Sequence, residues 1–164
     1  MSIRNAAKAL IINDNKILMI KCQNTVANML EDLPIGAIYY DLPGGGQNQY
    51  ETLEEAVKRE CLEETGYTIA VEKLAAVYEE ILTNEDFRTK WGDYAHKVHF
   101  LFACRIDDEL VKTPSETDLD MVEAVWIDIS DVTADFPWHP KIIRDSLERV
   151  LEFESTLYLG SAYY

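Results

Sequence analysis

The sequence predicts an α/β protein in which a mixed sheet carries a helix on each of its two faces. Short apolar runs rich in β-branched and aromatic residues recur along the chain, one helical pattern lies in the middle, and a second lies near the end. Helices placed in this way imply layers on both faces of one sheet. With 164 residues and no repeat or low-complexity segment, residues 1–164 are expected to form a single domain.

The first predicted elements form a β-hairpin. Residues 6–12 and 16–22 are apolar, and the Asn-Asp-Asn segment at 13–15 between them tolerates left-handed backbone conformations. The next stretch, residues 23–37, has no clear hydrophobic period. We therefore expect it to be a surface loop.

A short strand and a glycine-rich turn precede the central helix. The strand is predicted over residues 38–42, and the Pro-Gly-Gly-Gly segment at 43–46 is predicted to be a turn. Thr52 and Glu55 have the spacing of a capping box, in which each side chain accepts a hydrogen bond from the other residue's backbone amide. The helix is therefore expected to begin at Thr52 and to end at Gly66.

The second half of the chain completes the sheet and supplies the other helix. Strands are predicted over residues 69–82 (one bent strand or two short ones), 98–106, 123–127 and 156–164. Residues 84–94 are polar with one tryptophan, which predicts a long loop. Residues 137–153 have the 3.6-residue period of an amphipathic helix.

The central helix concentrates negative charge on one face. Glu60, Glu63 and Glu64 stand at positions i, i+3 and i+4, so their carboxylates lie within reach of one another. Like charges at that separation repel, and a divalent cation removes the repulsion. Because the ligands are all oxygen atoms, they favour Mg²⁺ or Mn²⁺ over a soft metal.

Residues 45–67 resemble the Nudix box, the signature of the Nudix hydrolase family. The box consists of a glycine, five residues, Glu, seven residues, and then Arg-Glu-x-x-Glu-Glu-x-Gly. Its fixed positions are occupied here by Gly45, Glu51, Arg59, Glu60, Glu63, Glu64 and Gly66. A merely solvated, Glu-rich helix face would not require the glycine loop and the Arg-Glu pair at these offsets. The resemblance implies the Nudix fold, an α/β/α sandwich with a central mixed sheet.

Two positions depart from the family pattern. Cys61 replaces an aliphatic residue, and as a small hydrophobic side chain it suits the buried side of the helix. Tyr50 stands where the family usually has glycine. Since a tyrosine rarely adopts positive φ, we expect the loop to avoid left-handed geometry at Tyr50.

The resemblance also implies roles for the box residues. The implied ligands of Mg²⁺ or Mn²⁺ are Gly45 (through its carbonyl oxygen), Glu51 (directly or through water), Glu60, Glu63 and Glu64. Glu63 is expected to be a ligand or the general base, and Glu64 a catalytic ligand. Arg59 is expected to orient a carboxylate through a bidentate ion pair.

Residues outside the box are further candidates. In parts of the family the general base lies on a later loop, where this chain has Glu116, Asp118, Asp120 and Glu123. Tyr40 and Trp91 are candidates for stacking on a nucleobase, and Glu123 is a candidate substrate contact. The alternative for each is a solvated carboxylate or a core or rim aromatic. His96 and His99 are expected to be strand or rim residues and not catalysts.

Composition restricts the partners. The chain has 15 basic and 30 acidic residues and a net charge of −15, which repels nucleic acid polymers but not a small nucleotide that arrives with its own metal.

Three widely spaced cysteines indicate neither disulfides nor zinc and fit a reducing cytoplasm. Polar residues at 13–16 interrupt the apolar N-terminal segment, so no membrane span is expected. The aromatic tail suits an edge strand or a homodimer contact.

These features favour a Mg²⁺-dependent enzyme that hydrolyses a pyrophosphate bond in a nucleoside diphosphate derivative, such as ADP-ribose, a nucleotide sugar or a dinucleotide. One alternative is a nucleoside triphosphate pyrophosphohydrolase that removes damaged nucleotides. An alternative of another class is a non-catalytic, nucleotide-sensing Nudix domain. Such domains usually lose box carboxylates, and this chain keeps them all. An isomerase would need acid and base residues that the sequence does not indicate.

Overall fold

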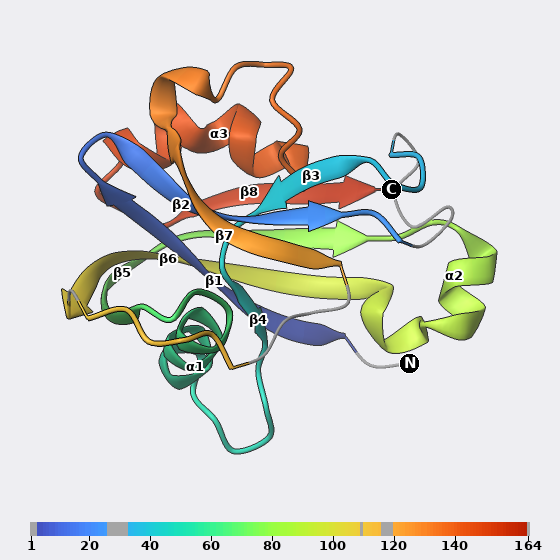
Figure 1. Ribbon diagram of the computed structural model, residues 1–164. Coiled ribbons are helices and arrows are strands. Elements are labelled where there is room, and N and C mark those ends of the chain that lie inside the picture. Colours follow the sequence, from blue (N-terminus) through green and yellow to red (C-terminus); the bar gives the residue numbers. More distant parts are fainter. Residues whose placement is uncertain (1–2, 26–32, 109, 116–119, 164) are drawn as a thin grey trace.

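The computed structural model describes residues 3–25, 33–108, 110–115 and 120–163. Its strands form one mixed sheet in the order β3-β2-β1-β6-β5-β8, with β4 paired to β1 and β7 paired to β2. Helix α1 lies against one face of the sheet and α3 against the other (Figure 1). This arrangement confirms the predicted α/β class and the three-layer sandwich. No helix among these residues is long and apolar enough to cross a membrane.

Most predicted elements are confirmed within a few residues. The strands are β1 (Arg4–Asn13), β2 (Lys16–Gln23), β3 (Ile38–Asp41), β4 (Gly44–Gly46), β5 (Thr68–Ile81), β6 (His96–Asp108), β7 (Met121–Asp128) and β8 (Leu157–Tyr163). The α-helices are α1 (Leu53–Thr65), α2 (Glu85–Lys90) and α3 (Lys141–Glu152). Part of the predicted surface loop, residues 26–32, lies outside the described residues.

Local signals fix the first hairpin and the central helix as the sequence predicted. Asp14 and Asn15 connect β1 to β2 with φ of 48° and 61°, the left-handed geometry of a tight hairpin turn. At the start of α1, Thr52 and Glu55 form both hydrogen bonds of the capping box. At its end, Gly66 has φ of 76° and donates its N–H to the Leu62 carbonyl, 2.9 Å away.

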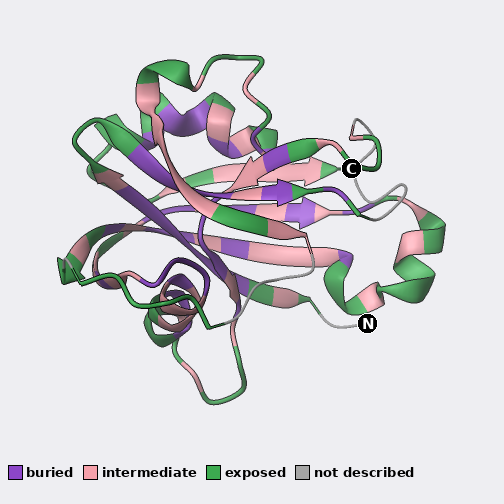
Figure 2. Ribbon diagram, viewed as in Figure 1, coloured by how far each residue is buried: buried purple, intermediate pink, exposed green. Residues whose placement is uncertain are grey.

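Strand β1 separates the two halves of the core. Ala7, Ala9 and Ile11 face α1 and pack in a cluster with Cys61, whereas Leu10 faces the opposite side and packs in the α3 cluster. The inner strands and the inward sides of both helices are therefore buried (Figure 2). Because alanines face α1, the helix that carries the box can approach this part of the sheet closely.

The glycine-rich segment at 43–46 is a strand where a turn was predicted. Gly44–Gly46 pair antiparallel with β1, with Lys8 opposite Gly44. Gly44 has φ of 128°, and a Cβ atom there would lie 2.1 Å from the Ala7 carbonyl oxygen. Glycine is thus required because the two backbones approach closely. The pairing joins residues far apart in sequence, so no local pattern indicated it.

The prediction of a long loop at 84–94 is also wrong. This segment contains α2 and a 3-10 helix, Gly92–Tyr94. The Asn84 side chain caps α2 by accepting a hydrogen bond from the Phe87 amide at 2.9 Å. A helix of six residues is too short to show an amphipathic period.

The expected geometry at Tyr50 is wrong as well. Tyr50 has φ of 70°, in the left-handed region, and its side chain is 96% exposed. The loop requires this conformation because it is closed by local hydrogen bonds. Glu51 accepts from the Asn48 amide at 2.9 Å, and the Gln47 side chain donates to the Glu51 carbonyl at 2.6 Å. Tyr50 therefore occupies a position that favours glycine, with its ring in solvent.

We predict that Tyr50→Gly stabilises the protein by about 0.5 kcal/mol. Relief of left-handed strain, worth about 1 kcal/mol or more, exceeds the extra entropy that glycine gives the unfolded chain. Urea denaturation measures the change. The control is Gln49→Gly, at an exposed neighbour with ordinary φ, which should destabilise by roughly 0.5–1 kcal/mol. Equal destabilisation by both variants would contradict the assigned strain.

Candidate catalytic site

Arg59 is the centre of the carboxylate cluster on α1. Its guanidinium donates to both oxygens of Glu51, at 2.7 and 3.0 Å, in a bidentate pair. The third nitrogen, Nη1, donates to Glu60 at 2.8 Å and to Glu63 at 3.0 Å, and Nη2, one of the two nitrogens paired with Glu51, also donates to the Gly46 carbonyl at 3.1 Å. The hydrogen bonds from Arg59 lower the pKa of Glu51. Arg59 thus joins helix, loop and β4 through one positive charge.

Glu60 lies directly beside the backbone of β4. A Cβ atom at Gly45 would lie 2.5 Å from a carboxylate oxygen of Glu60, so glycine leaves room for Glu60 in this orientation and a larger residue would displace its carboxylate. The close approach places the Glu60 carboxylate against the strand that carries Gly45 and Gly46. Two of the predicted site residues, Gly45 and Glu60, are therefore brought together by the packing of α1 on β4.

Glu64 has a different environment from its neighbours on the helix. Its carboxylate is buried and accepts a hydrogen bond from the Gly44 amide at 2.8 Å. Burial raises the pKa of Glu64 to about 8, although the positive charge of Lys8 and the Gly44 amide act in the opposite direction. The stabilisation of ionised Glu64 by Lys8 and by the Gly44 amide is therefore smaller than the cost of burying its charge.

Buried Lys8 and half-buried Asp41 form an ion pair close to Glu64, and sequence reasoning missed both. The Lys8 ammonium lies 2.7 Å from the Asp41 carboxylate and donates to the Leu42 carbonyl at 3.1 Å. Burial alone would lower the pKa of Lys8, but the negative charges of Asp41 and Glu64 raise it. The available signal was a lysine inside the otherwise apolar run AAKALII.

Another polar cluster is centred on buried Glu80 of β5, with partners on β6 and in the segment just before α3. One Glu80 oxygen is 3.4 Å from His99 and 3.7 Å from His139, and the other is 3.0 Å from the Lys97 ammonium. Burial opposes ionisation of Glu80, yet Lys97 and the imidazoles hold its pKa well below the usual range. His99 stacks on Tyr78 with ring centres 4.5 Å apart. His99 is thus a packed strand residue, as expected.

The candidates outside the box lie in separate surroundings. Tyr40 is half-buried and packs on Phe136 with ring centres 4.9 Å apart. Trp91 is 49% exposed and Glu123 pairs with Lys21 at 2.9 Å. Among the candidate bases, Asp120 bonds to Thr25, and Glu116 and Asp118 lie outside the described residues.

The site contains oxygen donors but not a closed coordination shell. Among the side chains that the structure describes, no three His, Cys, Asp or Glu residues are already spaced as ligands of one metal ion. Glu51, Glu60 and Glu63 turn toward Arg59 instead. These carboxylates are partly exposed, so changes in side-chain torsion angles are sufficient to redirect their oxygens.

Comparison with known proteins identifies the family to which the chain is similar. The NUDIX domain family model matches residues 2–146. Over 140 residues the chain is 32% identical to an ADP-ribose pyrophosphatase of Methanocaldococcus jannaschii, and this alignment covers 85% of the chain and 70% of that protein.

Solved structures share the fold. A NUDIX hydrolase from Nitrosomonas europaea superposes with a TM-score of 0.68 at 20% identity, covering 90% of this chain and 87% of that one. A UDP-X diphosphatase superposes with a TM-score of 0.62 at 18% identity, covering 96% of this chain and 68% of that one. The sequence match, the fold and the carboxylate-bearing helix together show that the chain belongs to the NUDIX domain family of pyrophosphohydrolases.

Proposed function

We propose that this chain hydrolyses the pyrophosphate bond of a small nucleoside diphosphate derivative, with Mg²⁺ or Mn²⁺ bound by the α1 carboxylates. The observation that carries the proposal is the set of carboxylates that Arg59 gathers beside Gly45 and Gly46. Such a concentration of negative charge on one helix face is stabilised by divalent cations, and its oxygen donors match those that Mg²⁺ and Mn²⁺ prefer.

Each box residue has a distinct part in this proposal. Glu60 and Glu64 are direct ligands, with Gly45 and Glu51 completing the set. Glu63 is a further ligand or the base that accepts a proton from the attacking water. When bound, the cation supplies charge neutralisation on the phosphoryl oxygens and acidifies a coordinated water. Arg59 keeps the carboxylates oriented, which is a positioning role.

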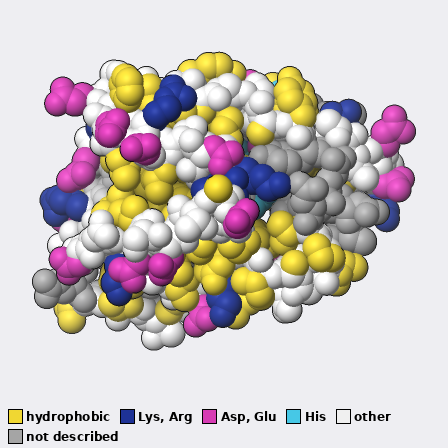
Figure 3. All heavy atoms as spheres, turned by 90° about the horizontal axis from the view of Figure 1, so that it is seen from above, with side chains coloured by type: hydrophobic (Ala, Val, Ile, Leu, Met, Phe, Trp, Pro, Cys, Tyr) yellow, Lys and Arg dark blue, Asp and Glu magenta, His cyan; other side chains and the backbone are white. Residues whose placement is uncertain are grey.

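Charge and the nature of the relatives both support a small substrate. The net charge is −15, and the face in Figure 3 carries scattered acidic side chains and only small, separate groups of Lys and Arg. The described residues of this face form no continuous basic track for a nucleic acid polymer. One relative is an ADP-ribose pyrophosphatase and one structural neighbour a UDP-X diphosphatase, so ADP-ribose, nucleotide sugars and dinucleotides are the first substrates to test.

Other candidates remain in the proposal as alternatives. A damaged nucleoside triphosphate would place the same bond type beside the same carboxylates. A non-catalytic, nucleotide-sensing domain is disfavoured because every box carboxylate is present.

We further propose a cytoplasmic enzyme that forms one domain over residues 1–164. Pairing through the β8 edge, where Tyr158 and Tyr163 are exposed, would give a homodimer.

A substrate panel with product analysis tests the proposal. We expect Mg²⁺-dependent release of a nucleoside monophosphate from at least one of ADP-ribose, a nucleotide sugar or a dinucleoside polyphosphate, and no turnover of capped RNA. Micromolar to millimolar KM is expected. Release of pyrophosphate from oxidised triphosphates alone would select the first alternative. Binding without turnover of any nucleotide would select the sensing domain.

We predict that Glu64→Gln and Glu60→Gln each lower kcat on the order of a thousandfold at saturating Mg²⁺. The amide keeps the size of the side chain but removes the charge that a cation requires. Glu54→Gln, an exposed change on the same helix, is the control and should retain wild-type kcat. Near wild-type turnover by either site variant would show that the ligand roles are misassigned.

We predict that Arg59→Lys lowers kcat by roughly tenfold to a hundredfold with α1 still folded. Lysine keeps the charge but cannot form the bidentate pair with Glu51 while also contacting Glu60 and Glu63. Steady-state kinetics and circular dichroism measure both properties. The control is Lys58→Arg, the reverse exchange at the exposed neighbouring position. Activity within twofold of wild type would exclude a positioning role for Arg59.

We predict that Mn²⁺ affinity rises with pH up to about pH 8. The raised pKa of Glu64, about 8 against an ordinary value of 4.5, means that the metal-free folded protein holds a proton there at neutral pH. The cation must displace this proton, so affinity should rise by up to about tenfold per pH unit below pH 8 and level off above it. Calorimetric titration at several pH values measures the slope of Mn²⁺ affinity against pH, and this slope should be smaller in Glu64→Gln. A flat profile would contradict the assignment.

A further inference from the structure

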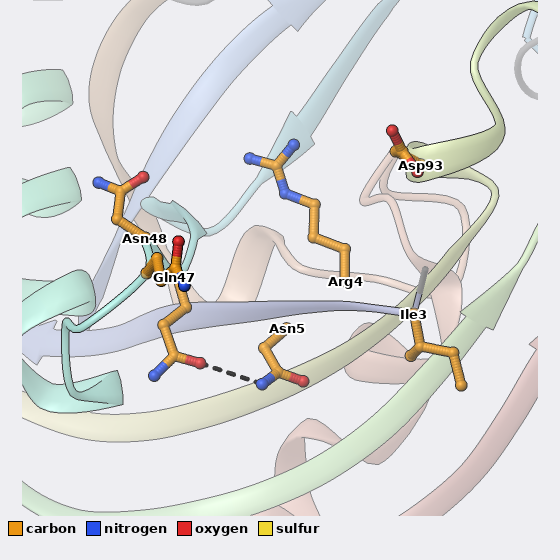
Figure 4. A pocket seen from close by; sticks show the side chains of 7 residues that line it. Ile3, Arg4, Asn5, Gln47, Asn48 and Asp93 are labelled. Carbon is orange, nitrogen blue, oxygen red and sulfur yellow. Dashed lines mark hydrogen bonds between the residues drawn. The ribbon is translucent and has the colours of Figure 1, made fainter. Parts of the chain in front are cut away.

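A polar cavity of about 410 Å³ opens beside the loop that connects β4 to α1. It is lined by Ile3, Arg4, Asn5, Gln47, Asn48, Gln49 and Asp93. The Arg4 side chain rises from β1 between Asn48 and Asp93, while Asn5 points the other way and bonds to Gln47 at 3.0 Å (Figure 4). Apart from Ile3, every lining side chain is polar, and Arg4 is the one that carries positive charge.

The guanidinium of Arg4 lies over an aromatic ring and close to the backbone of β4. It lies 4.5 Å from the centre of the Tyr94 ring, and a Cβ atom at Gly46 would lie 2.1 Å from one of its nitrogens. None of the described acidic side chains forms an ion pair with Arg4. In a chain with 30 acidic and 15 basic residues, an arginine without an acidic partner in the described region is available to bind an anion.

Strand β4 places this arginine next to the catalytic carboxylates. Successive residues of a strand face opposite sides, so Gly45 faces Glu60 while Gly46 faces Arg4. The Gly46 carbonyl also accepts from Arg59 at 3.1 Å. In the described sheet β4 pairs only with β1, and its other edge is lined by Arg59 and by Glu64, which accepts a hydrogen bond from the Gly44 amide. A substrate whose diphosphate lies at the α1 carboxylates can therefore extend around this edge toward Arg4.

We propose that Arg4 binds an anionic group of the substrate outside the scissile diphosphate, either a phosphate or a carboxylate. A guanidinium recognises both through paired hydrogen bonds. The amide side chains of Asn48 and Gln49 beside it can donate to and accept from sugar hydroxyls. This inference rests on the proposed function and narrows it, because the favoured substrate carries a phosphorylated or carboxylated sugar.

The kinetic test uses matched substrates that differ in one anionic group. UDP-glucuronate against UDP-glucose tests a carboxylate, and NADP⁺ against NAD⁺ tests a phosphate. Wild-type enzyme should have the higher kcat/KM for the charged member of at least one pair. Arg4→Gln should raise KM for that member by roughly tenfold to a hundredfold and leave the neutral member within twofold. Arg4→Lys should recover part of the preference.

The matched control is Arg105→Gln, an exposed arginine farther along β6. It removes the same charge and should leave the preference of the wild-type enzyme intact. Absence of any charged-substrate preference in the wild type would overturn the proposal. An equal rise in KM for the charged and the neutral substrate in Arg4→Gln would also overturn the proposal, because that result indicates a structural role for Arg4.

A binding measurement separates this proposal from the catalytic one. With EDTA present, inorganic phosphate added to about 100 mM at constant ionic strength should shift the NMR signal of the Arg4 side-chain N–H groups. The side-chain N–H signal of Arg105 should not shift. Failure of every substrate to react, with the Arg4 shift present, would reject the proposed function but support the anion site. An unchanged Arg4 signal would reject the anion site.

Discussion

The hydrogen bonds of Arg59 are the constraint on which the site depends. Without a positive charge among them, the carboxylates of Glu51, Glu60 and Glu63 would repel one another on a short segment of helix and loop. Arg59 holds all three and also bonds to Gly46 on β4. The same side chain thus links α1 to β4 and gathers the oxygen atoms of the site.

The sheet contributes by allowing this close packing. Ala7 and Ala9 present small side chains to α1, and Gly44 and Gly45 let backbone and carboxylate groups approach without a Cβ atom between them. On the opposite face of β1, Lys8 pairs with Asp41 and places a buried positive charge near Glu64. Positive charge therefore lies on two sides of the acidic site, on Arg59 of the helix and on Lys8 of the strand, although burial still raises the pKa of Glu64.

The sequence predicted features that depend on local signals. The limits of α1 follow from Thr52, Glu55 and Gly66, which act within one turn of the helix. Features that depend on distant contacts were missed. Strand β4 forms only through its pairing with β1, and Lys8 meets Asp41 across 33 positions. Tyr50 was misjudged because a residue preference was weighed without the hydrogen bonds that close its loop.

The most direct test of the account is to locate a bound cation. Mn²⁺ broadens the NMR signals of nearby amides, so substoichiometric Mn²⁺ should first broaden those of residues 44–46, 51, 60, 63 and 64. The broadening should disappear when Mg²⁺ is added in excess. Broadening centred instead on the Glu80 and His99 cluster of β5 and β6, with the α1 amides unaffected, would contradict the claim that the Arg59-organised carboxylates form the metal site.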